Sequence, residues 1–263
     1  MIEVEAPLVA GRNKPGQFIV LRVNEKGERI PLTIVDSSAE RGSIALIFQV
    51  VGKTTRLLSE LNEGDCVLDV VGPLGKPTEV KRYGTVALVG GGVGIAEIYP
   101  EAKAFKAAGN EVLGIIGART AELLILEEEL RQICDEVHVA TDDGSRGQRG
   151  FVSDVLKRLM EERRIDLVYA VGPTLMMKAV SNLTKPRGIK TLVSLNPIML
   201  DATGMCGACR VKVGGEIRFA CVDGPEFDGH LVDFDLLMAR QRMYLEEEKM
   251  ALELYERSKG GGS

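Results

Sequence analysis

The residues of this sequence that are most able to do chemistry are three cysteines that fall close together. Cys206 and Cys209 are separated by two residues, and Cys221 follows after eleven more. Thiolates at C-x2-C spacing in a glycine-rich turn can bind one metal centre from a single loop, because glycine lets backbone amides approach the sulfur atoms. The chain holds five cysteines. An odd number in a sequence without an export signal argues against a disulfide framework.

Three interpretations of this cysteine cluster stay open on spacing alone. The thiols can be buried structural side chains, or they can bind a zinc ion. The third interpretation is a 2Fe–2S cluster, which needs a fourth ligand. Asp201 lies five residues before Cys206, where a plant-type C-x4-C-x2-C run has its first cysteine. A carboxylate there completes a set of one aspartate and three cysteines, with Asp223 and Asp228 as the nearest alternatives.

Glycine-rich turns follow apolar runs in the middle of the chain. Residues 85–89 lead into Gly90–Gly94 and then into a helical stretch. A strand, a glycine turn and a helix N-terminus form a phosphate site, because the amides point outward and the helix dipole favours anions. The G-x-G-x-x-G spacing is only partly met, and no ribose-binding acid ends the second strand, so an ordinary dehydrogenase domain is not expected. The candidate nucleotide contacts at these strand ends are Gly91, Gly92, Val93, Gly94, Gly117, Arg119, Asp143, Gly144, Ser145, Gly172, Pro173 and Met176.

The first third of the chain carries weaker signals for a phosphate or flavin site. Arg29–Thr33 opens a strand, and Gly52–Thr55 precedes a short helix whose amides and hydroxyls can hold a pyrophosphate. A nucleotide-hydrolysing P-loop is excluded, because Ile47 stands where the required earlier glycine would be. Ordinary barrel turns explain the same motifs, which by themselves do not identify a flavin.

The elements that must position these residues fall into three parts and a tail. Residues 1–80 show short β-rich runs, which predicts a small antiparallel barrel. Residues 81–190 alternate strands and helices, which predicts a doubly wound parallel sheet. Residues 191–230 hold the cysteines and fit neither pattern. The expected strands are 4–9, 18–23, 44–50, 66–71, 85–89, 111–116, 136–140 and 166–171, and the expected helices are 96–108, 123–134, 152–162 and 174–183.

Residues 231–263 are expected to form a C-terminal helix followed by a flexible Gly-Gly-Gly-Ser end. The apolar stripe of residues 231–257 predicts packing on a partner subunit, and packing on the same chain is the alternative.

Composition excludes several classes of function. The net charge of −5 and the lack of a basic run argue against nucleic acid. The N-terminus lacks the layout of a signal peptide, and no apolar run has membrane-spanning length, so a soluble, cytoplasmic protein is expected. We find no nucleophile–base pair and assign no role in catalysis to the two histidines.

Taken in order, the motifs resemble the ferredoxin–NADP reductase superfamily from about residue 15 to residue 228. Arg29–Thr33 is similar to the R-x-Y-S/T flavin motif, although Arg29 lies four residues before Thr33 instead of three. Gly172-Pro173 is similar to a C-G-P loop in which Val171 replaces the cysteine. The resemblance implies FAD on the barrel and NAD(H) on the sheet. The implied flavin contacts are Arg29, Pro31, Leu32, Thr33, Phe48, Gln49, Gly52, Thr54 and Thr55.

The cysteine cluster narrows this resemblance. It is similar to the electron-transfer subunit of two-subunit dihydroorotate dehydrogenases, where four cysteines hold a 2Fe–2S cluster. With Asp201 as the first residue of the set, it resembles the small subunit of NADH-dependent reduced ferredoxin:NADP+ oxidoreductase and of the related sulfide dehydrogenase. That resemblance implies Asp201, Cys206, Cys209 and Cys221 as metal ligands. It also implies a heterodimer with a large subunit that carries a second flavin and 4Fe–4S clusters and that reaches ferredoxin.

Three functions are therefore weighed. The first is an electron-transfer subunit that moves electrons between NAD(H), FAD and a 2Fe–2S cluster in a bifurcating ferredoxin:NADP oxidoreductase. The second is the electron-transfer subunit of dihydroorotate dehydrogenase, with the same cofactors and a different partner. The third is a zinc-stabilised regulatory module that binds a nucleotide without redox work. The resemblance favours the first.

Overall fold

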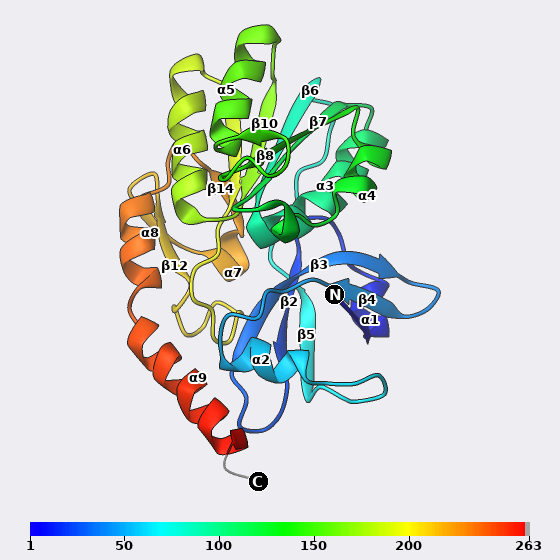
Figure 1. Ribbon diagram of the computed structural model, residues 1–263, viewed down its shortest axis with the longest axis vertical. Helices are drawn as coiled ribbons and strands as arrows, with labels where there is room; N and C mark the ends of the chain where they lie inside the picture. Colours follow the sequence, from blue (N-terminus) through cyan, green and yellow to red (C-terminus); the bar gives the residue numbers. More distant parts are fainter. Residues whose placement is uncertain (261–263) are drawn as a thin grey trace.

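A five-stranded antiparallel sheet forms the N-terminal part of the computed structural model, which describes residues 1–260 (Figure 1). The hydrogen-bonded order is β1-β4-β3-β2-β5, and the register shifts beside Phe18 and Ile34. Helix α1 contacts both β4 and β5, so it bridges the opening of the barrel. The elements are β1 (Ile2–Glu5), α1 (Pro7–Ala10), β2 (Phe18–Arg22), β3 (Arg29–Ser38), β4 (Ser43–Leu46), α2 (Lys53–Ser59) and β5 (Asp69–Leu74).

Three of the expected barrel strands have different limits. The strand expected at 4–9 ends at Glu5, because Pro7 begins α1, and proline suits the first position of a helix. The strand expected at 44–50 ends at Leu46, and the one expected at 66–71 is shifted to Asp69–Leu74. The barrel as a class is confirmed.

Seven strands form the second sheet, in the order β14-β11-β10-β6-β7-β8-β9. All neighbours are parallel except β14, which runs antiparallel to β11. The strands and helices are β6 (Thr85–Gly91), η1 (Gly92–Gly94), α3 (Ile95–Ala107), β7 (Glu111–Ala118), η2 (Ala121–Leu123), α4 (Glu127–Ile133), β8 (Glu136–Thr141), β9 (Gln148–Arg149), α5 (Val152–Glu162), β10 (Leu167–Val171), α6 (Thr174–Thr184), η3 (Lys185–Arg187), β11 (Lys190–Ser194) and β14 (Glu226–Asp228).

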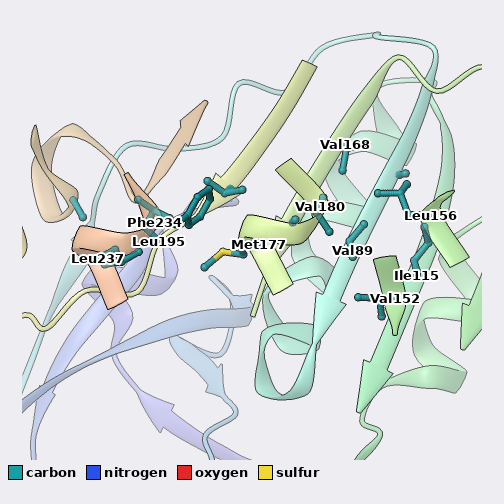
Figure 2. Close-up of a cluster of buried hydrophobic side chains, with 14 of the residues drawn as sticks. Val89, Ile115, Val152, Leu156, Val168, Met177, Val180, Leu195, Phe234 and Leu237 are labelled. Carbon is teal, nitrogen blue, oxygen red and sulfur yellow. The ribbon is translucent and has the colours of Figure 1, made fainter. Parts of the chain in front are cut away.

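Helices cover both faces of this sheet, as the alternation of strands and helices predicts. Along β6, Val86 and Leu88 point into one core, and Ala87 and Val89 point into the other. Helices α3 and α4 close the first core, and α5 and α6 close the second, which Figure 2 shows around Val89. The doubly wound parallel sheet is therefore confirmed.

The part that holds the cysteines is built on a β-hairpin. Strand β12 (Arg210–Val213) pairs with β13 (Glu216–Phe219), and the short helix α7 (Ala220–Asp223) follows. Gly214 and Gly215 both have positive φ angles, 61° and 85°, as a two-residue type I′ turn requires. The chain then enters β14, so this part is joined to the edge of the parallel sheet.

The C-terminal segment forms two helices with different surroundings. In α8 (Phe234–Gln241), Phe234 and Leu237 are buried in the same core as Met177 of α6 (Figure 2). The expected packing on a partner is therefore wrong for α8, because its apolar face lies on its own chain. Helix α9 (Leu245–Gly260) leaves Leu254 59% exposed.

Helix α9 runs along the flank of the molecule toward the barrel (Figure 1). It meets α2 near its end, where Tyr255 Oη donates to Glu60 Oε2 at 2.6 Å and Lys259 also binds Glu60. Most of the expected Gly-Ser end, residues 261–263, lies outside the described residues. Within residues 1–260, no helix has the length and apolar character needed to cross a bilayer.

Candidate functional site

The first site lies at the carboxyl ends of β6 and β10, where the sheet changes its direction of winding. Strands β7 and β8 follow on one side of β6, and β10 and β11 lie on the other. Ligands of doubly wound sheets bind at such a switch point. The structure brings two of the expected loops together there. A Cβ atom at Gly94 would lie 2.5 Å from the carbonyl oxygen of Val171, and one at Gly172 would lie 2.7 Å from that of Gly91.

The other two expected nucleotide loops meet beside them, at the ends of β7 and β8. Ser145 Oγ accepts a hydrogen bond from Ala121 N at 2.8 Å, and Asp143 N donates to Arg119 O at 3.3 Å. The hydroxyl and amide of Ser145 hold the pKa of the Asp143 carboxyl below its ordinary value. Gly117 packs against Val152, where a Cβ atom would lie 2.4 Å from a methyl group. All four loops thus line one edge of the sheet, with Arg119 exposed.

Replacing Gly94 with alanine tests whether this edge binds NAD(H). The added methyl group must displace the backbone of β10, and such overpacking costs about 1–3 kcal/mol. We expect NADH affinity to fall at least tenfold, with FAD content unchanged. Isothermal titration with NADH and flavin release measure the two effects. Gly11→Ala is the control, because Gly11 has a helical φ angle of −76°, comparable to the −61° of Gly94, and a Cβ atom there would lie at an ordinary contact distance of 3.5 Å from Pro7 O. Equal NADH affinity in the two variants would contradict the assignment.

The expected flavin residues lie on the outer face of β3 and around α2. Thr33 Oγ1 donates to Glu97 Oε2 of α3 at 3.2 Å, so Thr33 lies where the barrel meets the second sheet. Arg29 and Pro31 share this face by strand alternation, whereas Leu32 packs against the barrel core. Phe48 also packs against that core, and the side chain of Gln49 is exposed.

The two threonines expected at the flavin pyrophosphate have different partners. Thr54 is buried and donates to Glu28 Oε2 at 3.2 Å. Thr55 Oγ1 accepts from the amides of Val51 and Gly52, both at 3.0 Å, and so caps the start of α2. The loop at Gly52 is therefore ordered by its own chain.

The hairpin explains the spacing of the last two cysteines. Arg210 pairs with Phe219, so Cys209 and Ala220 stand opposite each other, and Ala220 N donates to Cys209 O at 3.1 Å. Cys221 follows directly, and its sulfur atom lies 3.1 Å from that of Cys209, with both side chains buried. Burial and the neighbouring thiol raise the pKa of Cys221 to about 12. Two buried thiols in contact suit a metal centre, whose positive charge stabilises thiolates.

The loop before the hairpin presents the other two expected ligands. Asp201 Oδ2 accepts from Cys206 N at 3.0 Å, and Asp201 Oδ1 accepts from Thr203 N at 3.0 Å, which lowers the pKa of this carboxyl. The alternative carboxylates are held elsewhere, because Asp223 accepts from Phe219 N and Asp228 from His230 N. Asp201 is the carboxylate that lies with the cysteines.

The four expected ligands fit a binuclear cluster better than a single ion. Within the described part of the chain, no three His, Cys, Asp or Glu side chains converge on one metal position. A 2Fe–2S cluster instead distributes its four protein ligands over two irons. Cys209 and Cys221 form one adjacent pair, while Asp201 and Cys206 come from one turn. Gly204 and Gly207 shape that turn with φ angles of 85° and 67°.

Four side chains near Thr33, two of them buried and two half-buried, were missed by the sequence analysis. They are Glu97 and Glu101 of α3, Tyr169 of β10 and Glu226 of β14. The signal that points to Glu97 and Glu101 is their i, i+4 spacing, which places both carboxyls on one face of a helix. For Glu226 and Tyr169, the sequence holds no comparable signal.

Comparisons with known proteins match the two regions that hold the cysteines and the glycine-rich loops. Residues 196–233 match the iron–sulfur cluster binding domain of dihydroorotate dehydrogenase B, and residues 88–182 match the oxidoreductase NAD-binding domain. A homologue of the electron-transfer subunit of dihydroorotate dehydrogenase B from Thermotoga maritima is 52% identical over 257 residues, which cover 98% of this chain and 91% of the relative. That subunit from Desulforamulus reducens is 35% identical over 234 residues, 86% of this chain and 89% of the relative.

One solved structure is similar over nearly the whole chain. It comes from work on flavin-based electron bifurcation and is that of the NADH-dependent reduced ferredoxin-NADP oxidoreductase. It has a TM-score of 0.91 and 52% sequence identity, and the match covers 98% of this chain and 92% of that one.

The fold and the sites define a ferredoxin reductase-like oxidoreductase with a barrel, an NAD-binding sheet and an iron–sulfur part. The chain belongs to the family of dihydroorotate dehydrogenase B electron-transfer subunits and their homologues. It is an electron-transfer subunit of an oxidoreductase, with NAD(H), FAD and a 2Fe–2S cluster as its cofactors and a larger catalytic partner. The expected class and cofactors are confirmed, and the iron–sulfur match disfavours the zinc module.

Proposed function

We propose that this chain is the electron-transfer subunit of a ferredoxin:NADP oxidoreductase of the electron-bifurcating type. The observation that carries this proposal is Asp201, which lies with three cysteines in place of a fourth. The similarity to the NADH-dependent reduced ferredoxin-NADP oxidoreductase structure, at 52% identity, supports it. The subunit of dihydroorotate dehydrogenase from D. reducens is more distant at 35% identity.

In this proposal each part of the chain has one task. The glycine loops around Gly94 and Gly172 bind NAD(H), and the outer face of β3 at Thr33 binds FAD. Asp201, Cys206, Cys209 and Cys221 hold the cluster. Flavin supplies the chemistry that links NAD(H) to the cluster, because it accepts two electrons as a hydride and can release them one at a time. The protein positions the groups and excludes water from Cys209 and Cys221.

The flavin assignment is tested by the cofactor that the purified chain releases. Denaturation should release FAD at about one per chain, because the barrel offers one such face. Thr33→Val should lower FAD content, because it removes the hydroxyl at the centre of that face. Release of FMN, or no flavin from freshly purified complex, would overturn the proposal.

Asp201→Cys tests the fourth ligand. Oxygen is a harder ligand than thiolate, so an all-cysteine site must change the electronic environment of the iron. We expect the variant to keep a 2Fe–2S cluster with an altered electron paramagnetic resonance spectrum and midpoint potential. Asp223→Asn is the matched control and should leave both unchanged, because Asp223 accepts from Phe219 N. An unchanged spectrum in Asp201→Cys means that Asp201 is not a ligand.

The surface around the cluster suits docking of a partner. Met205, directly before Cys206, is 87% exposed, and Leu200, directly before Asp201, is 56% exposed. Helix α9 leaves Met250 61% exposed. Apolar side chains beside redox ligands favour a protein contact over open solvent. The proposed partner is a large subunit with a second flavin and 4Fe–4S clusters, which transfers electrons with ferredoxin.

Deleting residues 244–263 tests whether α9 binds that partner. The deletion keeps α8, whose Phe234 and Leu237 belong to the core, so the shortened chain should fold. We expect the affinity for the partner to fall at least tenfold, about 1.4 kcal/mol, because the exposed apolar face of α9 is lost. Co-purification and the identity of the captured subunit are the measurements. Tyr255→Phe is the control, since it removes only the contact with Glu60. Full retention of the partner by the deletion would exclude α9 from the interface.

A further inference from the structure

A cluster of one buried and two half-buried carboxyl groups lies where the three parts of the molecule meet. Glu97 and Glu101 come from α3, and Glu226 comes from β14, the strand that follows the cysteine hairpin. Tyr169 of β10 is fully buried, and Thr78, between the barrel and the sheet, is 8% exposed. We call these five residues the carboxyl cluster. Thr78 Oγ1 lies 2.9 Å from Glu101 Oε1 and also binds Glu226 Oε1, and Tyr169 Oη lies 3.0 Å from both Glu97 Oε1 and Glu226 Oε1.

The four contacts of this cluster can all be hydrogen bonds only if some of its carboxyl groups carry protons. Its two hydroxyls, on Thr78 and Tyr169, make four contacts with carboxyl oxygens. Each hydroxyl carries one hydrogen and can donate to one of its two carboxyl partners. The other two contacts are hydrogen bonds only if a carboxyl group donates, and an ionised carboxylate has no hydrogen to donate. Two of the three glutamates are therefore protonated when all four contacts are satisfied.

The burial and hydrogen-bond partners of the three glutamates indicate which two of them are protonated. Glu101 is fully buried and its Oε2 has no hydrogen-bond partner, so an anionic charge on Glu101 would be uncompensated. A protonated Glu101 donates to Thr78, and Thr78 then donates to Glu226. Protonated Glu97 donates to Tyr169, and Tyr169 donates to Glu226. Glu226 is left as the ionised member, accepting from both hydroxyls.

The charged groups around the cluster favour the same assignment. Glu226 is faced by Glu97 of α3 and Tyr169 of β10, and it receives positive charge from Lys190 of β11. Glu101 of α3 is faced by the other two glutamates. Burial raises the pKa of Glu97 and Glu101, and it raises that of Glu226 to about 7. Glu226, left ionised by the hydrogen count, is thus the member that can take up a further proton.

The cluster is connected to the expected flavin face. Thr33 Oγ1 donates to Glu97 Oε2 at 3.2 Å, and Glu97 reaches Glu226 through Tyr169. A hydride carries two electrons and one proton, so its transfer to a neutral flavin adds one negative charge at that face. In a buried, low-dielectric region a new negative charge raises the proton affinity of a nearby carboxylate.

We propose that Glu226 takes up one proton from solvent when the flavin is reduced and releases it on reoxidation, so that the carboxyl cluster couples proton binding to electron flow. The inference rests on the proposed flavin site at Thr33. In this step the Glu226 carboxylate gains an O–H bond, the proton comes from water, and no electron moves. The two electrons that reduce the flavin come from NADH, one of the established cofactors of the chain. The proton that Glu226 takes up offsets the negative charge that the hydride leaves on the flavin.

Infrared difference spectroscopy on the full chain with its FAD tests this directly. The reduced-minus-oxidised spectrum at pH 8 should contain the carbonyl stretch of a newly protonated carboxylic acid. Glu226→Gln should abolish that band, and Tyr169→Phe, which breaks the connection to Glu97, should diminish it. Glu129 is an exposed glutamate of α4, and Glu129→Gln should leave the carboxylic acid band unchanged. In a redox titration above pH 7, the wild-type flavin potential should fall by about 30 mV more per pH unit than that of Glu226→Gln, one proton per two electrons.

The outcomes separate this inference from the flavin assignment. A chain that binds FAD, loses it in Thr33→Val and shows no carboxylic acid band refutes the coupling and leaves the flavin site intact. A band that persists in Glu226→Gln refutes the choice of Glu226. FAD content that is unaffected by Thr33→Val removes the flavin assignment itself, and a band in that case comes from elsewhere. If Glu226→Gln does not fold, the test rests on Tyr169→Phe. A carboxylic acid band as strong in Tyr169→Phe as in wild type overturns the proposal.

Discussion

Replacing Cys221 with alanine is expected to remove the iron–sulfur cluster altogether, from two irons per chain to none. Cys221 and Cys209 form the buried pair of the site. The exposed turn holds Cys206, which is already a proposed ligand, and offers no further thiol for the position that Cys221 leaves empty. Burial raises the pKa of Cys221 to about 12, so its thiolate exists only when a metal compensates the charge. Alanine at position 221 removes one ligand and leaves Cys209 without its neighbouring thiol.

The measurements for Cys221→Ala are iron and acid-labile sulfide content and the electron paramagnetic resonance signal after reduction. FAD content and its reduction by NADH should survive, because the flavin face lies on β3. Cys66→Ala is the matched control, since Cys66 is an exposed thiol in the barrel part of the chain. A cluster that persists in Cys221→Ala, or one lost equally in Cys66→Ala, would contradict the assignment.

Glu226→Gln is expected to change how stability depends on pH. The folded pKa of Glu226 is raised from 4.5 to about 7, so the folded state binds this proton more tightly than the unfolded state does. Its favourable contribution is complete below about pH 4.5 and is lost as pH rises through 7, at a total cost of about 3 kcal/mol. Glutamine cannot ionise, so the variant escapes this loss.

The measurement is thermal unfolding of wild type and Glu226→Gln at pH 5 and pH 8. The difference in melting temperature, Glu226→Gln minus wild type, should be larger at pH 8 than at pH 5 by roughly 6–12 °C. Glu129→Gln, an exposed glutamate, should run parallel to wild type. Parallel curves for Glu226→Gln would mean that Glu226 ionises in the folded state as it does in the unfolded chain.

Much of the fold was predictable because its signals are local. The apolar run at residues 85–89 and the glycine turn after it predict a strand and a phosphate-binding loop, and the structure has β6 and η1 there. The C-x2-C spacing of Cys206 and Cys209, followed by Cys221, indicates one metal centre, and the hairpin register places the sulfur atoms of Cys209 and Cys221 in contact. Such features depend on periodicity and on residues close in sequence.

The features that escaped prediction depend on contacts between distant parts. Glu226 meets Thr78 across 148 positions of sequence, and no local pattern indicates that the two are neighbours. The packing of α8 is a similar case, because an amphipathic stripe does not say whether it faces its own chain or a partner. Pro7 is a local signal, and it begins α1 where an apolar run had suggested a strand.

The most direct test of the account follows electrons from NADH through the isolated chain. Anaerobic addition of NADH to the purified protein should bleach the flavin absorbance and then produce the electron paramagnetic resonance signal of a reduced 2Fe–2S cluster. Cys221→Ala should bleach in the same way and give no cluster signal. A wild-type chain that carries zinc in place of iron, or whose cluster stays oxidised while its flavin is fully reduced by NADH, would contradict its assignment as an electron-transfer subunit.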